Sequence, residues 1–268
     1  MKRLLHRLFI LLALGVFLTS SARLLSYFYR YRSSTDVRQE AAAAFTKPAA
    51  ASEEAPGTEA ARGGDAAPDG SPVRAPIRVD FDRLRQVNPD VLGWIYCEGT
   101  VISYPVVFGR DNEYYLERDY RGQYNPSGSI FTDMRNENGF DDANVILYGH
   151  HMGDGTMFAS LKEWLDQAYY EEHPEMWLMT PEQDYRLELF AGYRTTADSE
   201  TYSIFREAGP ELQAYLDWAR SWSAIQSDVE TGPEGHYLVL STCAYSSEDA
   251  RTVLHGKLVP VGSGSVKK

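Results

Sequence analysis

The feature that most restricts the fold of this chain is a succession of short segments rich in β-branched and aromatic residues. Glycine, proline, asparagine and aspartate separate the segments, as in strands joined by tight turns. The candidate strands are residues 91–97, 100–107, 128–133, 144–149, 176–180, 185–194, 236–242 and 251–261. So many short strands predict a mainly β fold, a closed or nearly closed barrel of about eight strands.

Helices are expected as insertions between these strands. Asp80 is a suitable N-cap for a short helix at residues 81–87, and Asn88 before a proline would end it. A second helix is expected at 157–164. The clearest lies at 211–222, in the connection before strand 236–242, where apolar residues recur at helical spacing: Leu212, Tyr215, Leu216, Ala219 and Trp222.

The chain opens with an apolar run at residues 8–22 that follows three basic residues and resumes after Arg23. A cleavable signal peptide would end at the small residues 19–22. An uncleaved signal anchor would extend over residues 8–28, about the 20 residues that span a bilayer. Because the apolar run continues past the cleavage site, we expect residues 1–32 to be a cytoplasmic tip and single-pass anchor, with the body outside the cell.

Composition divides the rest of the chain. Residues 33–75 are mostly Ala, Pro, Glu, Gly and Ser, which bury too little apolar surface to offset the entropy of ordering. We expect a disordered spacer there, a single folded domain at 76–262 and a flexible tail at 263–268.

Charge and cysteine content exclude several classes of function. The net charge is −12 without any basic stripe, which argues against nucleic acid as a partner. Only two cysteines occur, Cys97 and Cys243, and neither lies in a spaced Cys/His cluster that could hold zinc. We expect no metal and no cofactor, and a disulfide between the two cysteines stays open.

Three residues that could carry chemistry stand where predicted strands begin or end. Cys243 follows strand 236–242 and precedes a polar loop, while His150 follows strand 144–149, with His151 pointing the opposite way. Arg251 opens the last strand. Taken singly, they are a small buried thiol, a hydrogen-bonded surface histidine and a surface ion pair with Glu248 or Asp249.

Together, these residues match what acyl transfer requires. The reaction needs a nucleophile, a proton donor for the leaving amine and a positive group where the oxyanion develops. Cys243, His150 and Arg251 can fill these roles in that order.

Longer motifs extend this pattern. The segments NPDVLGWIYCEGTVISYPVV, DNEYYLERDY, GSIFTDMRN, NVILYGHHMGDGTMFASL and LSTCAYSSEDAR resemble the sortases and, among them, class B. The resemblance covers residues 88–261. The helix expected at 211–222 resembles the one that class B members carry before the cysteine-bearing strand, and no acidic cluster resembles the calcium site of some class A members.

The resemblance implies a cysteine transpeptidase of the cell surface. Such an enzyme cleaves a C-terminal sorting signal, NPxTN-like or xPxTG-like, after its threonine and passes the thioacyl product to a peptidoglycan or pilin amine. Cys243 would be the nucleophile, His150 the general acid and base, and Arg251 the oxyanion partner. We also hypothesise that Ser241 orients the substrate and that the backbone at Thr242 supplements Arg251.

Three alternatives remain at this stage. One is a pilin-polymerising sortase. A secreted cysteine protease is the second, but it would carry its cysteine on a helix beside an orienting Asn or Asp. The third is a non-catalytic wall-binding module that kept the barrel.

Overall fold

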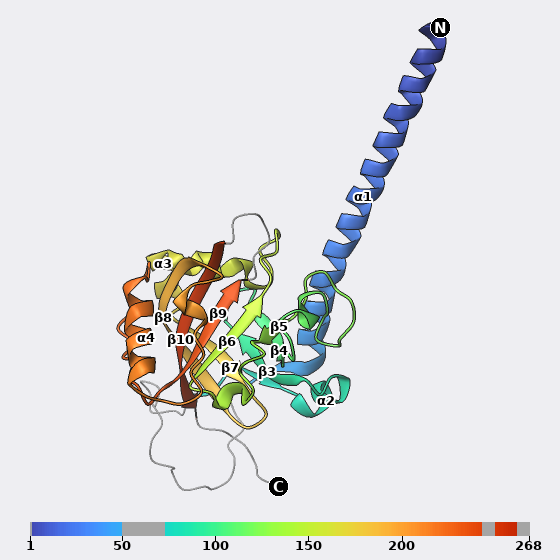
Figure 1. The fold of residues 1–268 in the computed structure, drawn as a ribbon. Helices are drawn as coiled ribbons and strands as arrows, with labels where there is room; N and C mark the ends of the chain where they lie inside the picture. Colours follow the sequence, from blue (N-terminus) through green and yellow to red (C-terminus); the bar gives the residue numbers. More distant parts are fainter. Residues whose placement is uncertain (1, 50–72, 243–249, 262–268) are drawn as a thin grey trace.

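The computed structural model describes residues 2–49, 73–242 and 250–261, and its body is a closed barrel (Figure 1). In the described part of the chain the strands follow one another around the barrel in the order β10-β8-β7-β3-β4-β5-β6-β9. Their bounds are β3 (Val91–Tyr96), β4 (Ser103–Val107), β5 (Ile130–Thr132), β6 (Asn144–Gly149), β7 (Glu175–Met179), β8 (Asp184–Thr196), β9 (His236–Thr242) and β10 (Ala250–Val261). The predicted mainly β barrel is confirmed.

The barrel is mixed, because β4 and β5 pair in parallel, as do β6 and β9, while the other neighbours are antiparallel. Every residue of β6 is buried, and so is every residue of β9 except its first, His236. Strands covered on both faces need continuous apolar runs, which explains the sequences NVILYG and YLVLST. Gly149 lies opposite Thr242, so β6 and β9 end at the same edge of the barrel.

The core has three parts. The barrel interior is filled by branched aliphatic side chains together with Trp164 and Phe158. A second cluster on the outside includes Trp94 and Ala41 and lies beneath the N-terminal elements. A third, with Phe190 and Leu216, lies beneath α4 (Pro210–Ser221).

The predicted helical insertions are present, with two differences. α2 (Phe81–Val87) begins at Asp80, whose side chain accepts a hydrogen bond from Arg83 N, and ends at the extended residue Asn88. Residues Phe158–Leu165 form a 3₁₀ helix, η3, rather than an α-helix. α4 buries the expected apolar face but ends at Ser221, so Trp222 caps it and is 61% exposed.

The remaining short helices are α3 and three 3₁₀ turns. Their bounds are η1 (Tyr114–Leu116), η2 (Gly139–Asp141), α3 (Gln167–Glu172) and η4 (Glu200–Tyr202). They connect strands around the barrel, and η1 and η4 border the cleft described below.

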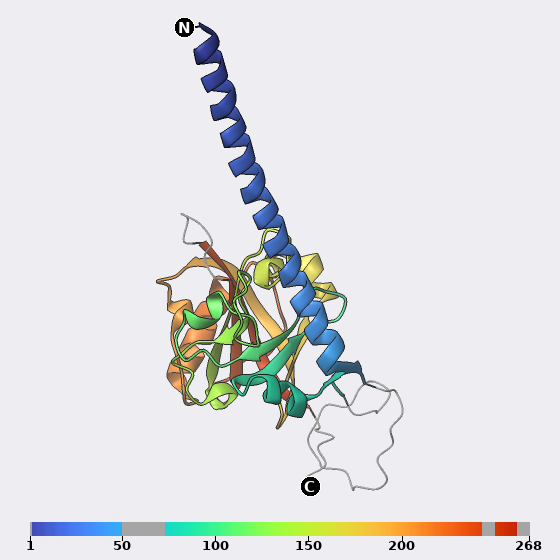
Figure 2. The same ribbon diagram turned by 90° about the vertical axis from the view of Figure 1, so that its right-hand side faces the viewer.

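The N-terminal part is a long helix, α1 (Lys2–Phe45), followed by β1 (Thr46–Pro48), which pairs with β2 (Ile77–Val79). Its first part points away from the barrel and its last turns lie against it (Figures 1 and 2). We expected a disordered spacer from residue 33. The alanine-rich segment instead continues the helix, because alanine has the highest helix propensity and Ala41 and Phe45 are buried against the barrel. Residues 50–72 of the expected spacer lie outside the described residues.

The predicted membrane anchor requires a correction. Among the described residues no helix has both the length and the apolar character needed to cross a membrane. The expected single-pass membrane location, with the body outside the cell, is contradicted by this finding.

Candidate active site

A cleft of about 410 Å³ lies where β6 ends and β10 begins. His150 and Arg251, which are far apart in the sequence, both line it. Its other walls come from the segment around η1, from β5 and the residues after it, and from the segment around η4: Asn112, Leu116, Phe131, Asp133, Arg135, Tyr148, Ala197 and Tyr202. The structure therefore brings together two of the three residues that the sequence analysis singled out.

His150 directly follows β6 and is buried, with 6% of its surface exposed. Its Nε2 is within hydrogen-bond distance of the Leu116 carbonyl oxygen. Because a carbonyl only accepts, Nε2 carries the hydrogen, and Nδ1 is the nitrogen that can exchange a proton. Burial lowers the pKa of His150, while the Leu116 carbonyl and Glu117 act in the opposite direction.

The neighbouring His151 does not share this environment. Its side chain is exposed, and it is not among the residues that line the cleft. Its backbone bridges to Met157, closing the loop that follows β6. The expectation that the two histidines face different ways agrees with this difference in exposure.

Arg251, the second residue of β10, is tied to the end of β9. Its Nη1 donates a hydrogen bond of 3.3 Å to the Thr242 carbonyl oxygen, and its guanidinium carbon lies 5.8 Å from the centre of the Tyr202 ring. A second bond of 2.9 Å runs from Thr252 N to Thr242 Oγ1. These contacts hold the guanidinium beside the last residue of β9. Glu248 and Asp249, considered as its ion-pair partners, lie outside the described residues.

The residues at the end of β9 are buried, Ser241 completely and Thr242 at 2% exposure. The Ser241 hydroxyl lies 2.9 Å from Tyr202 Oη and also donates to the Thr242 carbonyl oxygen. Ser241 therefore contacts the wall of the cleft. Cys243, the predicted nucleophile, is the next residue in the chain and lies outside the described residues.

Cys97 has the properties of a core residue. It is 2% exposed, and its Sγ lies 3.6 Å from the Glu175 carbonyl oxygen. Burial raises the pKa of its thiol to about 11, so the thiol stays protonated at neutral pH.

A charged network that the sequence analysis missed forms the wall next to β6. Arg135 donates two hydrogen bonds, of 2.8 and 2.7 Å, to the Asp133 carboxylate, and Tyr148 Oη donates another of 2.8 Å. Burial raises the pKa of Asp133, but these donors outweigh it, and the net shift is downward. The segment GSIFTDMRN contains Asp133 and Arg135, but the contact with Tyr148 depends on the pairing of β5 with β6.

In the described part of the chain, no group of three or more His, Cys, Asp or Glu side chains is placed to hold a metal ion.

Comparison with known families gives the family. The sequence model of the sortase domain matches residues 95–259, which is more than half of the chain and includes β4 through most of β10. This chain belongs to the sortase family. The match contains His150, Arg251 and Cys243.

Curated relatives indicate the class. This sortase is 32% identical to sortase B of Listeria monocytogenes over 260 residues, which cover 96% of this chain and 98% of the relative. It is 37% identical to sortase B of Staphylococcus aureus over 187 residues, or 69% of this chain and 77% of the relative. The resemblance to class B is confirmed, and the chain is a cysteine transpeptidase of that class.

Solved structures confirm the same fold. The Staphylococcus aureus sortase B-substrate complex matches with a TM-score of 0.65 at 38% identity, covering 68% of this chain and 85% of that one.

Proposed function

We propose that this sortase cleaves the C-terminal sorting signal of secreted proteins after a threonine and joins them to an amine of the cell wall. The observation that carries the proposal is the cleft itself. His150 and Arg251 line it from two separate strands, and Arg251 is bonded to Thr242, the residue before Cys243. A nucleophile, a proton carrier and a fixed cation in one place are what acyl transfer needs.

In the first half of the reaction, the Cys243 thiolate attacks the carbonyl carbon of the threonine. The carbon–sulfur bond forms, and the negative charge on the carbonyl oxygen is stabilised by the Arg251 guanidinium and by backbone N–H groups near Thr242. When the peptide carbon–nitrogen bond breaks, Nδ1 of protonated His150 gives its proton to the leaving amine. The product is a thioester between threonine and Cys243.

In the second half, an acceptor amine attacks the thioester. Neutral His150 takes the proton of the amine, the carbon–sulfur bond breaks, and the thiolate of Cys243 returns. The amide bond that is lost in the first half is replaced by a new one, so the reaction needs no external energy source.

The proposed mechanism needs His150 as imidazolium and Cys243 as thiolate in the first half of the reaction. Burial lowers the pKa of His150, although the Leu116 carbonyl and Glu117 partly oppose this. A thiol ordinarily has a pKa near 8.5. Positive charge beside Cys243 would favour its thiolate form.

Class B resemblance supports an NPxTN-like or xPxTG-like signal, and the solved sortase B-substrate complex of Staphylococcus aureus supports substrate binding by this fold. Apolar walls from Leu116 and Phe131 stand beside the hydroxyls of Tyr148 and Tyr202, a mixture suited to a short extended peptide. A peptidoglycan stem or cross-bridge amine is the proposed acceptor. A pilin lysine is the alternative.

The test is a matrix of fluorogenic sorting pentapeptides and candidate amines, with products identified by mass spectrometry. We expect cleavage after threonine and a new amide to at least one cell-wall amine. Transfer only to a pilin lysine would favour the polymerising alternative. Hydrolysis alone, despite abundant amine, would identify a protease and contradict the proposal.

A further inference from the structure

Met157 has a backbone conformation that L-amino acids rarely adopt. Among the residues that the structure describes, it is the one non-glycine with positive φ, at 56°. Such conformations persist only when the surrounding structure holds them, and they concentrate at functional sites. Met157 closes the loop that begins directly after His150, so the contacts that hold it bear on the active site.

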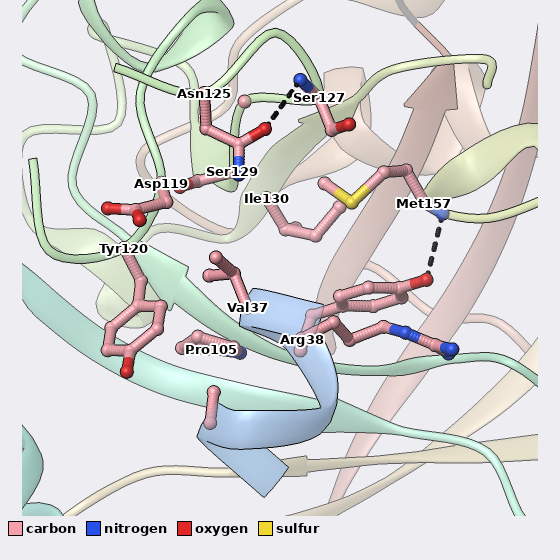
Figure 3. Close-up of a pocket in the computed structure, with 13 residues that line it drawn as sticks. Val37, Arg38, Pro105, Asp119, Tyr120, Asn125, Ser127, Ser129, Ile130 and Met157 are labelled. Atoms are coloured by element: carbon pink, nitrogen blue, oxygen red, sulfur yellow. Dashed lines mark hydrogen bonds between the residues drawn. The ribbon is translucent and has the colours of Figure 1, made fainter. Parts of the chain in front are cut away.

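Two contacts hold Met157. Its backbone N–H donates a 2.8 Å hydrogen bond to Tyr104 Oη, and its side chain is 6% exposed, packed in the barrel core with Tyr104 and Ile130. Figure 3 shows Met157 and Arg38 on the same side of a small pocket, with the dashed bond at the Met157 nitrogen. Tyr104 belongs to β4 and is itself buried, at 3% exposure.

Arg38 of α1 holds Tyr104 from the outside. Its guanidinium carbon lies 5.8 Å from the centre of the Tyr104 ring, and its Nη1 donates a 3.0 Å hydrogen bond to the Val101 carbonyl oxygen. The N-terminal helix therefore contacts both β4 and the residues just before it. Burial raises the pKa of Tyr104 to about 12, so its hydroxyl stays protonated at neutral pH.

The loop that Met157 closes is bonded to the backbone around His150. His151 and Met157 form an antiparallel bridge, and Phe158 N donates a 3.0 Å hydrogen bond to the His150 carbonyl oxygen. The Phe158 ring also packs against Gly149 so closely that a Cβ there would lie 2.8 Å from the ring. The backbone on both sides of His150 is thus fixed by the segment that Met157 anchors.

We propose that Tyr104, supported by Arg38, is a positioning residue that sets the orientation of the His150 imidazole through Met157. The inference rests on the proposed role of His150. Arg38, in the last turns of α1, would then influence the reaction through Tyr104 and Met157, without touching the substrate.

The test replaces Tyr104→Phe, which removes the hydroxyl and keeps the ring. We expect kcat for peptide transfer to fall about three- to tenfold, with KM changed less than twofold. Tyr237→Phe is the matched control. Tyr237 is also buried, its hydroxyl also bonds to backbone at Gly232, and it lies at the far end of β9 from the cleft. Its kcat should stay within twofold of the parent.

Arg38→Met is the second variant, for use if Tyr104→Phe gives too little folded protein. It keeps the aliphatic stem and removes the guanidinium, and we expect a kcat loss of about two- to fourfold with KM unchanged. Melting temperatures are recorded for all variants.

His150→Ala separates failure of this inference from failure of the proposed function. If His150→Ala is inactive but Tyr104→Phe has parental kcat, the positioning role is overturned and the proposed chemistry stands. Equal kcat losses in Tyr104→Phe and Tyr237→Phe would also overturn it, because the effect would then follow general stability. An active His150→Ala variant would remove the proposed function and this inference with it.

Discussion

Two regions of the barrel each bury a histidine, and the groups that surround the imidazole ring differ between them. At the cleft, His150 contacts a backbone carbonyl and stands near the Glu117 carboxylate. Beneath α4, His255 of β10 is enclosed by aromatic rings, with Tyr193 stacked on it at 5.3 Å. Its Nε2 lies 3.0 Å from Tyr193 Oη, and burial lowers its pKa to about 3.

The difference separates a histidine held in the core from the histidine of the proposed mechanism. Both rings lose solvation on burial, which disfavours the charged form. Only His150 has groups beside it that favour the charge, and only His150 lines the cleft. Burial alone therefore does not mark a catalytic residue, whereas burial beside acceptors and a cleft does.

The largest difference between the two regions should appear when each histidine is replaced in turn. We expect His150→Ala to lower the rate of peptide transfer by about 10²–10⁴-fold, because the leaving amine loses its proton donor. His255→Phe should leave kcat within about threefold, since Tyr193 Oη keeps its bond to Thr201 Oγ1. Steady-state kinetics on folded protein measures both.

Cys243→Ala provides the reference for complete loss in that assay, with no acyl-enzyme detectable by mass spectrometry. A His255→Phe variant as inactive as His150→Ala would contradict the distinction between the two regions.

Replacing Arg251→Lys tests the second residue of the proposed mechanism that the structure describes. Lysine keeps the charge but loses the planar fork that donates to the Thr242 carbonyl while facing the Tyr202 ring. We expect kcat/KM to fall about 10²-fold or more, with a small change in melting temperature. Near-parental turnover would remove Arg251 from the proposed mechanism.

His255 should contribute to the acid sensitivity of the fold. Its folded pKa of about 3 lies below the unfolded value near 6.5, so the unfolded chain binds the proton more readily. The stabilisation is complete above pH 6.5 and is lost as pH falls toward 3, by up to about 1.4 kcal/mol per pH unit. Urea unfolding of His255→Phe should show a shallower loss of stability between pH 6 and 4 than the parent.

His150→Ala is the comparison variant in that experiment. The change in slope should be smaller, because the Leu116 carbonyl and Glu117 offset part of the burial effect. Identical slopes for the parent and His255→Phe would show that His255 does not titrate with folding.

The smallest expected effect concerns the contact between β9 and the cleft wall. Tyr202→Phe removes the hydroxyl that lies 2.9 Å from Ser241 Oγ but keeps the ring that faces Arg251. We expect a loss of about two- to fivefold in kcat/KM. Tyr202→Leu, which also removes the ring, should lose more; equal activity of the two variants would mean that the ring does not hold Arg251.

Much of this fold was predictable from local sequence. The short strands, the Asp80 cap and the packed face of the helix before β9 all follow from side-chain periodicity and turn residues. The structure of residues 33–48 was not predictable, because their composition resembles that of a spacer. Ala41 and Phe45 pack against residues that lie far along the chain. The end of α1 is thus fixed by tertiary packing.

The site was predictable in part. His150 and Arg251 stand at strand termini, where local patterns could find them. The contacts of Tyr148 with Asp133 and of Tyr202 with Ser241 could not be found that way, because they join segments that are distant in the sequence. No local signal announces that β6 pairs in parallel with a strand that begins at His236.

That parallel pairing has a consequence for the time at which the enzyme becomes active. His150 directly follows β6 and is synthesised about ninety residues before Thr242, the last residue of the partner strand β9. Arg251 is synthesised later still. Pairings between distant segments form slowly and require both strands to be present. A nascent chain that has only reached β8 contains His150 but lacks Thr242 and Arg251, so the cleft between the ends of β6 and β10 cannot form until synthesis of the barrel is nearly complete.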